Sequence, residues 1–197
     1  MKLSLLAALA VTSLPLYAQT PKLEAKSLEA LKEKPAVTAP KFVPKSTGPV
    51  VEKKRAYTFT AKGTASKAAR VITMTDGTKT ECPLVEIPLR FLKDSTQLAD
   101  PQSKANLAVL ADHLKANGDG GKFCIEGHAS AEGDGTHNQT LSEQRAQAIR
   151  DELIANGVAP TVLAPPVGRG ALDATVSAKA SEQELAQDRR VLVVREQ

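Results

Sequence analysis

The chain has 197 residues, which is enough for one domain of ordinary size and additional segments. Aromatic residues make up 3% of it and Trp is absent, so a core has to be built from Val, Leu, Ile and Ala. This composition favours one compact α/β domain over a large β-sandwich. The formal net charge is +4, and nine Lys or Arg face four Glu between residues 21 and 55. Such a basic segment attracts any polyanion, so by itself it does not identify a partner. We do not expect the partner to be a nucleic acid.

The first 18 residues are typical of an export signal. Lys2 precedes a short apolar run, and Ala18 offers the small residue that a signal peptidase requires. The run is too short to span a bilayer with certainty, and an uncleaved membrane anchor is the alternative. No Cys follows it, so we do not expect a lipoprotein anchor. We expect residues 1–18 to be removed and the mature chain, without a transmembrane segment, to reach the periplasm.

Residues 19–55 have the composition of a basic, Pro-rich linker. Residues 21–34 predict a short helix carrying Leu23, Leu28 and Leu31, too short and too charged to be stable alone. The four prolines between residues 35 and 49 favour an extended segment, so we expect a disordered Pro/Lys-rich linker. A dedicated binding motif is the alternative.

Residues 56–83 predict a small β-rich lead-in to the main domain. Residues 57–60 alternate polar and apolar side chains, as a half-buried strand does. Residues 71–75 and 78–80 flank Asp76 and Gly77, a pair typical of a hairpin turn.

Strands and helices alternate from residue 84 to residue 197. We expect strands at 85–91, 122–126 and 191–194. We expect helices from Asp100, as N-cap, to Gly118, from 141 to 156, and from 181 to 187. Thr140 and Glu143 would form a capping box at the start of the second helix. The alternation predicts βαβ units with helices covering a sheet.

Cys82 and Cys124 are the two cysteines of the chain. In an exported protein an isolated pair is a candidate for a disulfide, and two buried thiols packed as small hydrophobic groups are the alternative. Their spacing does not resemble a metal site, and we expect neither a metal nor a cofactor.

Residues 127–146, GHASAEGDGTHNQTLSEQRA, follow an expected strand and open an expected helix. Gly127 and Gly133 permit tight turns, and Asn138 and Ser142 can bind the backbone of the loop. Arg145 would lie in the first helical turn, where the helix dipole does not favour a cation. It therefore needs a carboxylate partner from the protein or from a ligand.

This segment resembles the C-terminal domain of the OmpA-like, peptidoglycan-associated family, whose pattern is GHTDxxGxxxxNxxLSxxRA. The resemblance extends over residues 84–195 and implies an α/β fold, a βαβ-type sandwich of helices on a small mixed sheet. It rests on in-register matches within the pattern and on flanking motifs: Gly127, His128, Gly133, Asn138, Leu141, Ser142, Arg145 and Ala146; Phe91, Ser95 and Leu98; Gly168 and Gly170; and Asp188, Arg189, Arg190 and Val191.

The resemblance implies a non-enzymatic module that binds the diaminopimelate of peptidoglycan stem peptides and links the envelope to the cell wall. Arg145 would hold the free carboxylate. The family's Thr-Asp pair, whose Asp holds the ammonium, is Ala129 and Ser130 here, so Glu132 or Asp134, both in the same loop, would have to supply the missing charge. The remaining positions carried over to the pocket are Asn138, Leu141 and Arg189.

Three interpretations of this site remain open on the sequence alone. In the first, Arg145 still binds the wall with help from Ser130 or Glu132. In the second, the fold is kept but diaminopimelate binding is lost at Ser130, and the protein interacts with other envelope proteins. In the third, Arg145 is structural and pairs with Glu143 or Glu132.

Overall fold

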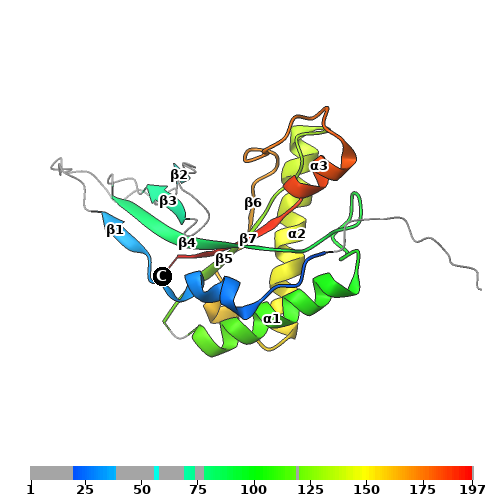
Figure 1. Ribbon diagram of the computed structural model, residues 1–197. Helices are drawn as coiled ribbons and strands as arrows, with labels where there is room; N and C mark the ends of the chain where they lie inside the picture. The colour runs from blue at the N-terminus through cyan, green and yellow to red at the C-terminus, as the bar shows by residue number, and fades with distance from the viewer. Residues whose placement is uncertain (1–19, 39–55, 58–68, 74–77, 119, 197) are drawn as a thin grey trace, which may run out of the picture.

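The computed structural model describes residues 20–38, 56–57, 69–73, 78–118 and 120–196 (Figure 1). The expected export signal, most of the Pro-rich stretch and the expected turn at Asp76 and Gly77 lie outside these residues. Within the described part of the chain, no helix combines the length and the apolar character needed to cross a membrane.

Among the described residues, seven strands form one mixed sheet, and helices pack on it. The order is β2-β3-β4-β7-β5-β6, with β1 also beside β4; β5 and β6 are parallel and every other pair is antiparallel. This arrangement confirms the predicted α/β fold class. The strands are β1 (Ala36–Thr38), β2 (Ala56–Tyr57), β3 (Ala69–Thr73), β4 (Lys79–Ile87), β5 (Phe123–Gly127), β6 (Val167–Gly168) and β7 (Val191–Arg195). The helices are α1 (Pro101–Asn117), α2 (Gly135–Ala155) and α3 (Glu182–Asp188), with 3-10 helices η1 (Ala25–Lys32) and η2 (Pro160–Val162).

The main core lies between one face of the sheet and the helices. Alternate residues of β5 and β7, such as Ile125 and Val193, point into this core, while Cys124 and Val194 belong to a second cluster on the opposite face. Every residue of β5 and β7 is buried, which is the expected state of central strands covered on both sides.

Residues 20–38, expected to be part of a linker, instead pack against the domain; we call them the N-terminal strap. Figure 1 shows η1 beside α1, below the sheet. Leu23, Leu28 and Leu31 of the strap are at most 3% exposed and belong to the main core. The strap also pairs through β1 with β4. The short helix that we expected therefore forms, and tertiary packing supplies the stability that its length does not.

Hydrogen bonds fix the strap to the domain at two places, near Leu23 and at Leu31. The backbone N–H of Leu23 donates to the side-chain oxygen of Asn106 at 2.8 Å, and the Asn106 amide donates to the carbonyl of Pro21 at 2.8 Å. Arg195, at the end of β7, donates to the carbonyl of Leu31 at 2.8 Å. The buried amide of Asn106 is thus satisfied by the strap together with Gln102 and the carbonyl of Pro88.

The expected hairpin is present as β3 and β4, which pair from Ala69 opposite Pro83 to Thr73 opposite Lys79. β4 continues through the boundary that we expected between residues 83 and 84, and its second half pairs with β7. The β-rich lead-in and the main domain consequently share one strand.

Helix α2 begins six residues earlier than expected. Its N-cap is Asp134, whose carboxylate accepts from the backbone N–H of His137 at 2.9 Å. Thr140 is not a cap; its hydroxyl donates to the carbonyl of Thr136 one turn back. Arg145 therefore lies ten residues into the helix, and the argument from the helix dipole in the first turn does not apply to it.

The two cysteines do not form a disulfide in the structure; they are buried thiols in the second cluster. Cys82 is on β4 and Cys124 on β5, and β7 lies between these strands. Two strand spacings amount to about 10 Å, whereas a disulfide requires Cα atoms within about 7 Å. Packing as small hydrophobic groups, the second of the two alternatives, is what the structure shows.

Candidate functional site

The side chain of Arg145 is held in place by the loop that follows β4. Its Nε donates to the carbonyl of Ser95 at 3.0 Å and its Nη2 to the carbonyl of Leu92 at 3.3 Å. The guanidinium also stacks over the ring of Phe91, 4.9 Å from its centroid. Among the described residues, Nη1 has no hydrogen-bond acceptor, and Arg145 lines a pocket. One edge of the guanidinium is thus left for a ligand.

Arg145 is a buried cation without a carboxylate of its own in the described part of the chain. The interpretation in which Arg145 is structural required an ion pair with Glu143 or Glu132. Arg145 makes neither pair among the described residues. The pKa of Arg145 is lowered to about 10, chiefly by burial and also by the charge of Arg189, while the charge of Asp94 opposes the shift. The side chain stays protonated at neutral pH, and an anion in the pocket would stabilise it.

The loop after β5 forms the wall opposite this guanidinium. Ala129 and Ser130 are buried, and the backbone N–H of Ala129 donates to the carbonyl of Gly170 at 2.8 Å. Asn138 of α2 donates from Nδ2 to the carbonyls of Ser130, at 3.2 Å, and of Glu132, at 2.8 Å. Asn138 therefore shapes the loop, and the small side chain of Ala129 leaves space beside it.

Glycines allow the ends of β5 and β6 to touch α2. A Cβ on Gly127 would lie 2.1 Å from the carbonyl oxygen of Ser142, and one on Gly168 would lie 2.6 Å from the backbone N of Glu143. Gly127 is therefore required for close approach rather than for the tight turn that we expected, whereas Gly133 does turn with a φ of 82°. The hydroxyl of Ser142 accepts from the N–H of Gly170 at 2.8 Å, which ties the glycine loop to the helix.

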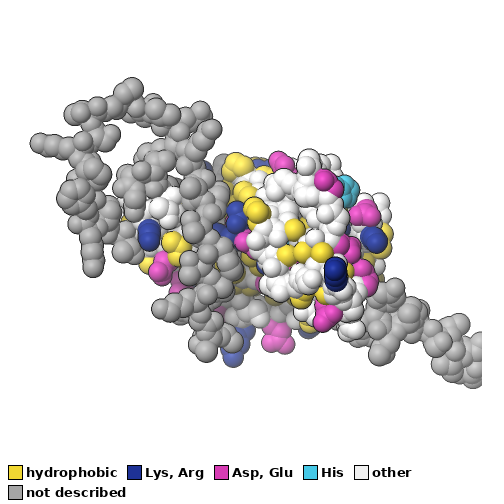
Figure 2. All heavy atoms as spheres, turned by 90° about the horizontal axis from the view of Figure 1, so that it is seen from above, with side chains coloured by type: hydrophobic (Ala, Val, Ile, Leu, Met, Phe, Trp, Pro, Cys, Tyr) yellow, Lys and Arg dark blue, Asp and Glu magenta, His cyan; other side chains and the backbone are white. Residues whose placement is uncertain are grey.

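These elements enclose a pocket of about 360 Å³. All seven residues that the sequence predicted for the site line it. Three cationic side chains, Lys93, Arg145 and Arg189, face two carboxylates, Asp94 and Glu132. Figure 2 likewise shows acidic and basic side chains mixed on the surface seen from above, not a patch of one sign. The lining consists of Lys93, Asp94, Ala129, Ser130, Glu132, Gly133, His137, Asn138, Leu141, Arg145 and Arg189.

Sequence reasoning missed Lys93, Asp94 and His137 as pocket residues. Asp94 adopts a positive φ of 47° at the tip of the loop that grips Arg145, and its carboxylate lies 3.5 Å from Nε2 of His137. For Lys93 and Asp94 the available signal was their place between Phe91 and Ser95, two residues that carry the family resemblance, and for His137 it was its place inside the spaced pattern of residues 127–146.

Arg189, which follows α3, is paired within the chain. Its Nη2 donates to the carboxylate of Glu182 in α3. Asp188 is fully buried, pairs with Arg190 at 3.2 Å and accepts from the backbone N–H and hydroxyl of Thr175. Arg189 thus reaches the pocket as a cation that is already paired.

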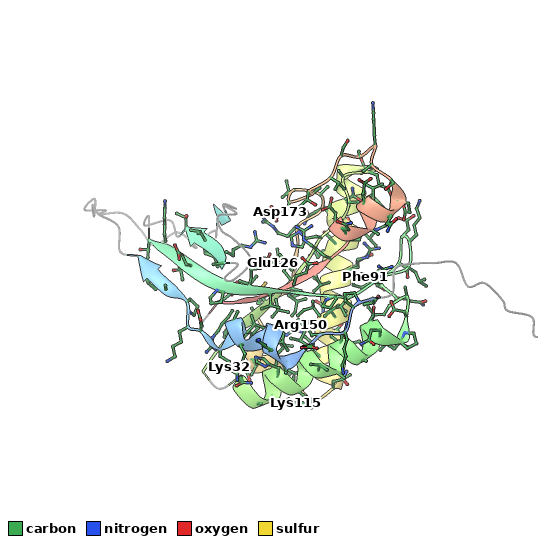
Figure 3. The ribbon with its side chains drawn as sticks, viewed as in Figure 1. Lys32, Phe91, Lys115, Glu126, Arg150 and Asp173 are labelled. Carbon is green, nitrogen blue, oxygen red and sulfur yellow. The ribbon has the colours of Figure 1, made fainter. Side chains whose placement is uncertain are left out.

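A buried ionic cluster lies on the face of the sheet opposite the main core. Arg70 of β3 pairs with Glu126 of β5 and lies 3.6 Å from Asp173. In Figure 3, Glu126 and Asp173 lie close together, away from Lys115 on α1. The ring of His128 is between these carboxylates, 3.8 and 3.7 Å away, and burial lowers the pKa of His128 despite them. His128 immediately precedes Ala129 in the chain and is buried, so this ionic cluster anchors the start of the pocket loop.

Residues 90–190, just over half of the chain, match the model of the OmpA family. The chain belongs to the OmpA family. The matched segment begins just before the Arg145-binding loop and ends at Arg190, so it contains every described element of the pocket.

Relatives of this OmpA family domain carry the name peptidoglycan-associated lipoprotein. Those of Pseudomonas putida and Pseudomonas aeruginosa are each 37% identical over 101 residues, which is 51% of this chain and 58% and 57% of theirs. The match thus spans little more than half the length of these relatives. The crystal structure of the peptidoglycan-associated lipoprotein from Burkholderia pseudomallei aligns with 28% identity and a TM-score of 0.48, over 55% of this chain and 88% of that one.

Proposed function

We propose that this domain binds peptidoglycan non-covalently in the periplasm and so links the envelope to the cell wall, without catalysing a reaction. The observation that carries the proposal is the buried guanidinium of Arg145, with an edge open to the pocket. Two relatives named for their association with peptidoglycan support it.

The ligand group that fits best is the free end of diaminopimelate, which carries a carboxylate and an ammonium on one carbon. The carboxylate would accept from Nη1 of Arg145. A hydrogen bond to a charged group contributes about 1.5–3 kcal/mol, and burial of Arg145 protects it from competing water. The methylene chain would pack against Leu141 and Ala129, which line the pocket between the charged residues.

Sedimentation with purified sacculi tests the proposal. The wild-type chain is expected to pellet with sacculi at physiological salt, and Arg145→Ala is expected to bind at least tenfold more weakly. Arg145→Lys should recover little, because an ammonium lacks the planar fork that Ser95, Leu92 and the ligand share.

The control for a general charge effect is Lys104→Ala, which removes an exposed cation of α1 that does not line the pocket. If the chain binds sacculi only through its basic N-terminal segment, raised salt should dissociate it from them. If wild type and Arg145→Ala stay equally in the supernatant, wall binding is wrong, and envelope proteins become the partners to seek by cross-linking.

Ser130→Asp is expected to tighten binding to sacculi severalfold. A carboxylate at this position would accept a charge-assisted bond from the ligand ammonium, which is about twice as strong as a bond to a neutral hydroxyl. The measurement is the same titration with sacculi, and unchanged affinity would mean that the ammonium is held elsewhere or that the pocket is used differently.

A further inference from the structure

The loop between β4 and α1 brings a carboxylate to the pocket beside the guanidinium of Arg145. Its ends are closed, because Phe91 bridges Leu98 and the N–H of Leu92 donates to the carbonyl of Gln97 at 3.0 Å. The carbonyls of Leu92 and Ser95 are the two acceptors for Arg145. Asp94 lies between them in the chain, so the contacts that place the guanidinium also place this carboxylate.

The backbone conformation of Asp94 suggests that its side chain has a use. A φ of 47° lies in the left-handed region, which glycine adopts without steric cost and other residues adopt at some cost. Residues held in sparsely populated regions concentrate at ligand sites. Asp is one of the residues that adopt this region most readily after glycine, and this turn places the Asp94 carboxylate in the pocket lining.

The charge of Asp94 is available to a ligand. Its side chain is 63% exposed, and among the described residues its carboxylate lies 3.5 Å from Nε2 of His137, whose side chain is itself 58% exposed. Exposed pairs of this kind contribute little free energy, so an incoming cation can replace the imidazole. The deeper pocket residue Ser130 carries no charge.

Proximity to Arg145 distinguishes Asp94 from Glu132, the other carboxylate in the pocket. The carboxylate and ammonium at the free end of diaminopimelate share one carbon, so the groups that receive them have to be neighbours. Asp94 directly precedes Ser95, whose carbonyl accepts from Nε of Arg145, whereas Glu132 lies on the loop after β5, where its carbonyl accepts from Asn138.

We infer that Asp94 receives the ligand ammonium and that the anionic half of the site has moved from the loop after β5 to the loop before α1. This inference rests on the proposed function and names the residue that completes its site. It accounts for the tolerance of Ser130 where a carboxylate would otherwise be required.

Calorimetric titration with two synthetic stem peptides tests the inference. One peptide carries diaminopimelate; the other carries 2-aminopimelate, which keeps the distal carboxylate and lacks the distal ammonium. Asp94→Asn is expected to weaken binding of the first peptide about tenfold and to leave binding of the second unchanged. Asp94→Gly should weaken the first peptide equally, although glycine suits the φ better. Asp112→Asn, which removes an exposed carboxylate of α1, is the matched control and should change neither.

Rescue provides the second arm of the experiment. Ser130→Asp added to Asp94→Asn should restore binding of the diaminopimelate peptide, because either carboxylate can receive the same ammonium. If Asp94→Gly binds the diaminopimelate peptide with wild-type affinity, Asp94 serves only the turn and the inference is overturned. The inference is also overturned if Glu132→Gln, and not Asp94→Asn, weakens binding of the diaminopimelate peptide alone.

Failure of this inference is distinguishable from failure of the proposed function. If the wild-type chain binds neither peptide and Arg145→Ala changes nothing, both are wrong. If the wild type binds, Arg145→Ala weakens binding and Asp94→Asn does not, only the role of Asp94 is wrong.

Discussion

Leu28→Ala in the N-terminal strap is expected to lower the free energy of unfolding by about 2–5 kcal/mol. Leu28 is fully buried in the main core, among residues of η1, α1 and β4. Alanine removes its packing and leaves a cavity that α1 and the sheet can close only in part. Urea unfolding of the full chain, followed by far-ultraviolet circular dichroism, measures the change.

Val37→Ala is the matched control, because Val37 is on β1 of the same strap but is 67% exposed. Its effect should stay within about 0.5 kcal/mol. A chain that starts at residue 39 loses all three buried leucines and should not fold under conditions in which a chain that starts at residue 20 does. Equal urea midpoints for Leu28→Ala and the wild type would show that the strap is not part of the core.

Arg70→Met is expected to destabilise the domain by about 3–5 kcal/mol. The guanidinium of Arg70 is fully buried beside Glu126 and Asp173, whose side chains are also buried. Methionine fills much of the space but leaves the buried Glu126 carboxylate without its cation, whereas Asp173 keeps its ion pair with Arg169 at 3.2 Å. The same urea unfolding experiment measures the loss.

A double variant separates the lost ion pair from the lost packing. Adding Glu126→Gln removes the carboxylate that Arg70 neutralised, so Arg70→Met with Glu126→Gln should be more stable than the sum of the single effects predicts. Strict additivity would show that the pair of Arg70 and Glu126 contributes nothing. The binding loop begins two residues after Glu126, so we expect peptide affinity to fall with Arg70→Met even below its unfolding midpoint.

Most of the pocket was predictable because its residues occur in one spaced pattern. Asn138, Ser142 and Arg145 are on consecutive turns of α2, so helix geometry alone places them on one face, independently of the rest of the fold. Asp94 was not predictable in the same way. It reaches the pocket through a contact between the carbonyl of Ser95 and Arg145, fifty residues apart, and no local pattern encodes such a contact.

The start of α2 was misjudged because Thr140 and Glu143 have the spacing of a capping box, and glycines precede them. The carboxylate of Asp134 caps the helix instead, and Gly135 is its first residue, so the local preference for a turn gave way to a satisfied N-cap. The strap shows the opposite case. Its helix was predictable from Leu28 and Leu31, but its burial depends on α1 and β4, and their surfaces do not appear in the strap's own sequence.

The two carbonyl contacts of Arg145 have a consequence for the entropy of binding. A free arginine side chain carries about 2 kcal/mol of rotamer entropy, which a ligand normally has to overcome when it immobilises the group. Here Ser95, Leu92 and the ring of Phe91 already restrain the guanidinium in the folded protein. That entropy is lost on folding rather than on binding, so the proposed site would be preorganised, and a small zwitterion would need few contacts to bind there.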